Sequence, residues 1–336
     1  MKKTIFLFFL FSIIIFSCKK EKEYSKTQFL LGTICEVKIV SSYNKDFVDK
    51  IFDKVFSEVE RINKTFGYSK DSEIYKINSN AGINEVVVSK EVFDLIKASI
   101  YIGDLTYGSF DITSGILSSI WKFEDLSNEE IKFKKPSEEE IKKVLDLVGY
   151  KKIVLDENKN SVFLPKKGMR INLGGIAKGY AIKKTKEILE SYKIERFLIN
   201  FGGDIYLKNK KNFNPWRIAV QHPRRKNEFL CILELNTTSC FTSGDYERFF
   251  MINNQRYHHI FDPKTGYPKE GVVSVTVLCE DPVFADALAT GIFVLGKDEG
   301  VKLAEKLNID VIIVVEEDNE IKVFTTEKLK NIKFNI

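Results

Sequence analysis

The sequence is poor in cysteine and histidine, the residues that build zinc sites and disulfide frameworks. It contains five cysteines and three histidines in 336 residues, and no two cysteines form a CxxC pair. A structural zinc site therefore has no support. A Walker phosphate loop, a GxGxxG fingerprint, internal repeats and low-complexity segments are also absent from the sequence. These absences favour one continuous domain of mixed α/β class.

A large excess of charge of one sign is missing as well. Lys and Arg number 52 against 47 Asp and Glu, which gives a net charge of +5. No basic stripe with interleaved aromatic residues occurs, so the sequence argues against a nucleic-acid binder. Hydrophobic residues make up 44% of the chain, ample for a sizeable core. Apart from its first segment, the chain therefore resembles a soluble α/β enzyme.

The first segment has the pattern of an export signal. Lys2 and Lys3 precede an apolar run over residues 5–16, interrupted only by Ser12 and too short to span a bilayer. The run ends at Ser17 and Cys18, which fit a bacterial lipoprotein cleavage site. The alternative, a buried strand, is disfavoured because the charged residues 19–23 follow at once. We therefore predict a signal peptide over residues 1–17 and an exported protein attached to the cell membrane by lipid on Cys18.

After the signal peptide, we expect a solvated, lipid-anchored tether over residues 18–28 and a single domain over residues 29–336. If Cys18 carries lipid, four scattered cysteines remain. Export permits disulfides, but their spacing indicates no pairing. We interpret them as ordinary core cysteines and leave their disulfide status open: Cys35, Cys231, Cys240 and Cys279.

Hydrophobic periodicity and turn residues predict alternating strands and helices. The charged segment 122–143 is expected to be an exposed insertion leading into a helix that ends near Gly149. A β-rich stretch is expected over residues 205–261, with a hairpin turn at Asn253 and Asn254. Strands are also expected at 29–40 (broken at Gly32), 152–155, 161–164, 169–173, 196–201, 272–278 and 311–315. Helices are expected at 47–65, 91–107, 176–192, 283–295 and 300–307.

A glycine pair between a predicted strand and helix could form an anion site. Gly174 and Gly175 allow close approach of the backbone to a ligand, and the following helix N-terminus offers unpaired N–H groups. Lys178 would add a positive charge suited to phosphate. The simpler interpretation is a tight turn followed by a solvated lysine.

Two oxygen ligands share one face of the helix predicted at 283–295. Asp286 and Thr290 lie four residues apart among alanines. A carboxylate and a hydroxyl suit Mg²⁺ when phosphate oxygens complete its coordination. On this pattern alone, a helix packed tightly against a sheet is the favoured interpretation of the small residues.

Two of the three histidines are adjacent, at His258 and His259. Neighbouring residues of a strand point to opposite faces, so at most one of them faces a given site. His259 is a candidate general base or ligand contact. Ser243 could be a nucleophile, but no GxSxG context supports that role. Asp111, in the segment 110–117, could bind the edge of a ligand ring or cap a helix.

The order of these motifs resembles the FAD:protein FMN transferase (ApbE) family. The resemblance covers the chain from about Phe29 to its end, and six separated blocks coincide in order. Many members of that family are exported lipoproteins. The blocks are residues 110–113, 173–181, 200–205, 242–248, His259 with 262–266, and 285–290.

The resemblance implies a T-fold-like α/β architecture, a single domain of two interlocked lobes that binds FAD. By similarity, Mg²⁺ would be held by the Gly175 carbonyl, Asp286 and Thr290. His259 would lie near the pyrophosphate. The residues implied to contact FAD or line its site are Leu31, Phe66, Gly67, Tyr68, Asp111 and Lys178.

The implied reaction is cleavage of FAD with transfer of FMN to a Thr or Ser hydroxyl of a target flavoprotein, releasing AMP. The target would be a membrane-associated redox subunit. Either His259 or the metal-bound Asp286 could take the proton of the hydroxyl, and the sequence does not choose between them. Alternatives are an FAD pyrophosphatase that uses water as acceptor and a non-catalytic FAD-binding lipoprotein.

Four positions depart from the family pattern without removing a proposed metal ligand. Leu31 replaces the usual methionine, Ile116 a common proline, and Asn172 a frequent aspartate. Gly67 stands where a small polar residue is usual, which leaves the details of flavin contact open.

Overall fold

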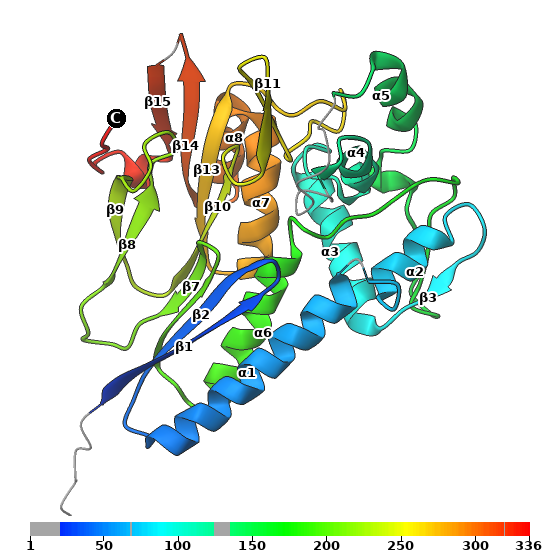
Figure 1. Ribbon diagram of the computed structural model, residues 1–336. Coiled ribbons are helices and arrows are strands. Elements are labelled where there is room, and N and C mark those ends of the chain that lie inside the picture. Colours follow the sequence, from blue (N-terminus) through cyan, green and yellow to red (C-terminus); the bar gives the residue numbers. More distant parts are fainter. Residues whose placement is uncertain (1–20, 68, 124–134, 319) are drawn as a thin grey trace, which may run out of the picture.

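An eight-stranded antiparallel sheet organises the protein (Figure 1). The computed structural model describes residues 21–67, 69–123, 135–318 and 320–336. The strand order is β1-β2-β6-β7-β10-β13-β14-β15. The strands are β1 (Lys22–Leu30), β2 (Thr33–Ser41), β6 (Arg196–Phe201), β7 (Asp204–Lys208), β10 (Thr238–Gly244), β13 (Val272–Cys279), β14 (Asp310–Glu317) and β15 (Glu320–Thr325).

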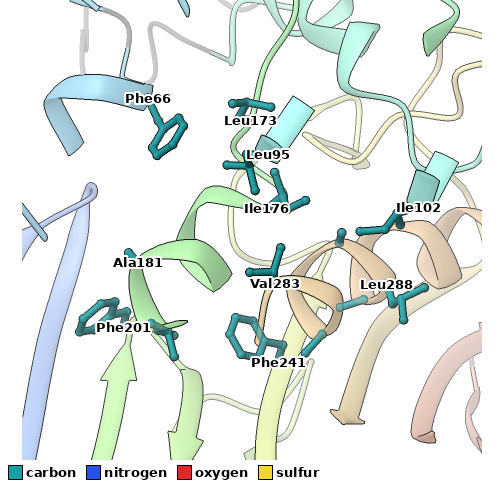
Figure 2. Packing of buried hydrophobic residues seen from close by; sticks show 14 of the residues in the cluster. Phe66, Leu95, Ile102, Leu173, Ile176, Ala181, Phe201, Phe241, Val283 and Leu288 are labelled. Carbon is teal, nitrogen blue, oxygen red and sulfur yellow. The ribbon is translucent and has the colours of Figure 1, made fainter. Parts of the chain in front are cut away.

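Three long helices pack with this sheet around the main hydrophobic core. They are α1 (Lys45–Phe66), α6 (Ala177–Ser191) and α7 (Pro282–Leu295). Asn44 caps the start of helix α1, since its side chain accepts the Phe47 N–H. The helix buries an apolar stripe of eight residues. Figure 2 shows Phe201 of β6 and Phe241 of β10 lying beneath Ala181 of α6 and Val283 of α7.

A mostly helical part lies beside the sheet (Figure 1). Its helices are α2 (Glu73–Ser79), α3 (Lys90–Leu105), η1 (Ile112–Ser114), α4 (Gly115–Ile120) and α5 (Glu138–Leu145), with the short turn η3 (Tyr150–Lys152). A small sheet contains β3 (Val86–Val87), β5 (Ser161–Phe163) and β4 (Val154–Asp156). The cleft between this part and the main sheet is where the candidate site forms.

Two hairpins and a C-terminal pair of elements complete the fold. The hairpin of β8 (Trp216–Gln221) and β9 (Phe229–Leu235) packs in a second core, with strands of the main sheet. The hairpin of β11 (Phe249–Ile252) and β12 (Gln255–His258) packs around Trp121 in a third. Helix α8 (Lys297–Lys306) and turn η4 (Glu327–Leu329) lie against β14.

The mixed α/β class is confirmed, and most predicted helices lie within a few residues of the observed ones. The hairpin turn at Asn253 and Asn254 is confirmed, and both residues have positive φ angles. The four cysteines in the described ranges are free thiols. Three of them are buried, as expected for core cysteines, and Cys279 is half-buried. No helix in the described ranges is long and apolar enough to cross a bilayer.

Two predicted segments are wrong. Residues 169–173 do not form a strand, because both backbone groups of Ile171 bond to the side chain of Asn78 instead of to a neighbouring strand. The expected solvated tether overlaps β1, so the part of it from Lys22 onward is a strand of the main sheet. Helices α2 and α4 and strand β15 are additional to the predicted elements. Cys18 and the signal segment lie outside the described residues.

Candidate active site

A cavity of about 720 Å³ opens between the main sheet and the helical part. Its walls come from the β1–β2 and β6–β7 turns, the start of α6, one face of α7 and the segment before β11. Tyr68 lies outside the described residues. All the other predicted metal, FAD and catalytic residues line this one cavity: Leu31, Phe66, Gly67, Asp111, Gly175, Lys178, His259, Asp286 and Thr290.

Two tight turns meet at the rim of the cavity. Leu31 and Gly32, which join β1 to β2, have φ angles of 55° and 71°. In the second turn, a Cβ built at Gly202 would lie 2.3 Å from the hydroxyl oxygen of Thr33. Only glycine fits there, and its N–H donates to the Ile34 carbonyl at 3.0 Å. The contact fixes both turns against each other.

Close contact between α6 and α7 places the start of α6 beside Asp286. A Cβ at Gly179 would lie 2.3 Å from the Pro282 carbonyl oxygen, so a larger residue would push the helices apart. The Gly179 N–H donates to Asp286 Oδ2 at 2.7 Å. The carboxylate therefore receives a hydrogen bond at the positive end of a helix.

Gly175 and Thr290 lie next to each other on the same wall. A Cβ built at Gly175 would be 3.3 Å from Thr290 Oγ1. The Thr290 hydroxyl is also 3.2 Å from that of Ser243. The cavity thus brings together the three residues that the resemblance implies for Mg²⁺: Gly175, Asp286 and Thr290.

The negative charge of the Asp286 carboxylate is unfavourable where it lies, and a nearby cation would stabilise it. Asp286 is 6% exposed. Its burial, together with the nearby carboxylate of Asp204, raises its pKa to about 7. A bound cation would offset both effects. Across the described part of the chain, no three His, Cys, Asp or Glu residues form a metal-ligand cluster. The set fits Mg²⁺ only if substrate oxygens or water complete the coordination.

Lys178 forms an ion pair with Asp204 inside the cavity. Burial alone would lower the pKa of Lys178, but the carboxylates of Asp204 and Asp286 raise it above its ordinary value. The other oxygen of Asp204 accepts the Thr242 N–H at 3.1 Å. Lys178 is therefore held in place and charged, instead of being the freely solvated lysine of the simpler interpretation.

Both oxygens of the Asp111 carboxylate accept hydrogen bonds from other residues of the protein. Oδ1 accepts the N–H and the hydroxyl of Thr113, at 2.8 and 2.6 Å. Oδ2 accepts the Tyr150 N–H at 2.9 Å. Burial raises the pKa of Asp111. The capping interpretation is thus what the geometry shows, although the residue also lines the cavity.

The two adjacent histidines face different cavities, as the strand alternation predicts. His259 lines the candidate site, whereas His258 lines a second cavity and its Nε2 lies 2.8 Å from the Lys269 carbonyl oxygen. His259 Nδ1 lies 3.2 Å from the Arg248 carbonyl oxygen. A carbonyl only accepts, so Nδ1 carries the hydrogen and Nε2 keeps a lone pair. Burial and the charge of Arg248 lower the pKa of His259 to about 3.

Comparison with known proteins agrees with this site. The profile of the ApbE family matches residues 31–313. The chain belongs to the ApbE family. It is 32% identical over 316 residues to an FAD:protein FMN transferase of Haemophilus influenzae, covering 90% of each chain. It is also 32% identical over 281 residues to an FAD:protein FMN transferase of Vibrio cholerae, covering 83% of this chain and 82% of that one.

Solved structures confirm the fold. An ApbE protein of Thermotoga maritima superposes with a TM-score of 0.83 at 35% identity, covering 92% of this chain and 98% of its own. The flavin transferase ApbE of Vibrio cholerae gives 0.81 at 27% identity, covering 93% and 100%. The predicted single-domain α/β fold and the predicted enzyme class of this ApbE-family chain are therefore confirmed.

Three charged residues of this ApbE-family site received no role from the sequence. Asp204 is paired with Lys178. Glu247 and Arg248 line the cavity, and Arg248 lies next to Gly32. All three lie within blocks that carry the family resemblance. For Asp204, the usable signal is a charged residue that follows a glycine pair and precedes the three hydrophobic residues of strand β7.

Proposed function

We propose that this protein transfers FMN from FAD to a Thr or Ser hydroxyl of a target flavoprotein in a Mg²⁺-dependent reaction, forming a phosphoester and releasing AMP. The observation that carries the proposal is the grouping of Gly175, Asp286 and Thr290 beside the Lys178–Asp204 pair in one cavity. At about 720 Å³ the cavity is within the size range of cofactor sites.

Asp286, Thr290 and the Gly175 carbonyl would hold the Mg²⁺ ion. When bound, the ion would neutralise charge on the pyrophosphate oxygens. Lys178 and the N-terminus of α6 face the same region and would stabilise negative charge as the bond to AMP breaks. Asp204 holds Lys178 in this orientation, so its contribution is positional.

His259 is the better placed of the two candidates to receive the proton of the acceptor hydroxyl. Its Nε2 lone pair is available because Nδ1 bonds to the Arg248 carbonyl. Asp286 would be occupied by the metal and already accepts the Gly179 N–H. The pyrophosphate of bound FAD would raise the low pKa of His259 toward a useful range. The hydroxyl oxygen then bonds to the FMN phosphorus as the phosphorus–oxygen bond to AMP breaks.

The test is incubation of the protein with FAD, Mg²⁺ and a flavoprotein domain that carries a candidate Thr. We expect the intact mass of the acceptor to increase by one FMN, with AMP released in equal amount. Free FMN and AMP with an unmodified acceptor would contradict transfer and support the pyrophosphatase. Bound FAD with no AMP would support a non-catalytic binder.

We also propose that the protein is exported and anchored through lipid on Cys18, with a membrane redox subunit as acceptor. The proposal is supported by the signal pattern of residues 1–17. Since β1 begins at Lys22, the intervening chain spans about 13 Å when extended, so an anchored domain would lie close to the membrane. Cys18→Ser should move the protein from the membrane fraction to the soluble fraction. Unchanged membrane attachment would contradict the anchor.

A further inference from the structure

The free edge of β1 leads directly to the candidate site. Strand β1 is the first in the sheet order and, among the strands that the structure describes, pairs only with β2, without a bulge. The strand ends at the Leu31–Gly32 turn, and both turn residues line the cavity. In Figure 1 the tip of this hairpin reaches the middle of the molecule. Any chain that follows the β1 edge toward its end therefore arrives at the mouth of the cavity.

The backbone of this edge can be assigned from the register. Leu30 and Thr33 flank a two-residue turn and so form a hydrogen-bonded pair. Because such pairs alternate along an antiparallel ladder, the N–H and C=O groups of Thr27 and Phe29 point away from β2. The same alternation applies to Glu23 and Ser25. Within the described ranges, no strand pairs with this side of β1.

Common protections of an edge strand are missing at the end nearest the site. The strand contains no proline, and its charged residues Lys22, Glu23 and Lys26 lie in its first part. The last four residues carry no charge. Here Phe29 and its cross-strand partner Ile34 are 74% and 63% exposed. An exposed apolar pair beside unpaired backbone groups is suited to bind another extended chain.

We propose that an extended segment of the protein acceptor adds to the β1 edge as a further strand and thereby delivers its hydroxyl to the cavity. This inference rests on the proposed transfer to a protein. A folded acceptor surface cannot enter a cavity, whereas an extended segment can. A segment paired with residues 23–29 would run about 20 Å along the edge. Its hydroxyl residue would then lie beyond Phe29, at the Leu31–Gly32 turn, with a neutral apolar side chain against Phe29 and Ile34.

The first experiment compares Thr27→Pro with Thr27→Val in the full chain. Proline removes the outward N–H of residue 27 without removing a bond to β2, and it is tolerated on the open side of edge strands. With FAD saturating, we expect Thr27→Pro to raise the KM for the acceptor by about tenfold, the effect of losing roughly one docking hydrogen bond. Thr27→Val, which keeps the N–H, should match wild type. FAD affinity, measured by flavin fluorescence, should be unchanged in both.

A second variant keeps the test decisive if proline disturbs the fold. Phe29→Ser combined with Ile34→Ser alters only exposed side chains and should also raise the acceptor KM, with kcat and FAD affinity retained. An acceptor KM equal to wild type in a folded variant would overturn edge docking. A wild-type dimer that Thr27→Pro converts to monomer would also overturn it, by showing that a second copy occupies the edge. Absence of any transfer by wild type would instead refute the proposed function.

Discussion

Asp286 holds its place through a bond that does not depend on its charge. The Gly179 N–H needs an acceptor oxygen at Oδ2, and an amide oxygen can serve as well as a carboxylate. The negative charge is itself unfavourable in this buried position, as the pKa raised to about 7 shows. Structure and chemistry therefore make different demands on the same side chain, and a substitution can separate them.

Asp286→Asn should fold normally and lose Mg²⁺-dependent transfer. The amide keeps the bond to Gly179 but provides a far weaker ligand, so we expect activity to fall by about a thousandfold, the magnitude typical of a lost electrostatic stabiliser. The thermal midpoint should stay within a few degrees of wild type or increase. Transfer assays over a magnesium titration, with thermal unfolding in parallel, check both expectations. Normal activity at wild-type magnesium concentrations would remove Asp286 from the metal site.

An element could be predicted from the sequence where its own local pattern decides its structure, and not where a contact with another element decides it. Helices α1 and α7 were predictable because each carries a cap at its start and a long apolar face. The apolar residues of 169–173 alternate in burial as in a strand, but the backbone there bonds to Asn78 of α2, which no local pattern indicates. Helix α2 has only seven residues, and its two buried isoleucines, Ile74 and Ile77, are too short a pattern to predict a helix.

Contacts between residues that are far apart in the sequence limit how much of the candidate site could be predicted. The resemblance of whole motifs to a family selected residues that line one cavity in the described part of the chain. Each single motif on its own left its alternatives open. The partner of Lys178 could not be found from spacing, because Asp204 reaches it only when β7 packs beside α6. The second carboxylate oxygen of Asp111 likewise accepts the N–H of Tyr150, which is far away in the sequence.

Gly179→Ala should damage both stability and activity, because the contact between α6 and α7 carries the Asp286 bond. The added methyl group would lie 2.3 Å from a backbone oxygen and 2.9 Å from Asp286 Cβ. We expect a loss of about 1–3 kcal/mol in the free energy of unfolding, the usual range for overpacking. Urea unfolding measures it, with Glu187→Ala on the exposed part of α6 as control. Equal stability of the two variants would show that the helices can separate without cost.

Burial in the folded molecule protects three of the four described thiols from chemical reagents. Cys35, Cys231 and Cys240 are buried, and burial raises their pKa values to about 11, 11 and 12. Thiolate, the reactive form, is therefore scarce at neutral pH in the folded protein. The same thiols return to ordinary pKa values and full exposure once the chain unfolds.

Iodoacetamide should therefore modify these three cysteines slowly in the native protein and rapidly in urea. We expect the native rate at pH 8 to be lower than that of the unfolded chain by at least about a hundredfold, from the shift of roughly two pH units in thiolate formation. Peptide mass mapping after timed quenching measures the rate at each cysteine. Fast modification of Cys240 alone would reveal local opening of β10 instead of a uniformly closed core.

The position of β2 in the sheet has a consequence for the order of folding. Strand β2 lies between β1 and β6, and Cys35 pairs with Phe201. The N-terminal hairpin must therefore wait until more than half of the chain has been made before it finds its second neighbour. Contacts between such distant segments form slowly, and a partly synthesised chain cannot bury this hairpin. The cavity, with one rim on that hairpin and its far wall on α7, can form only after nearly all of the chain is present.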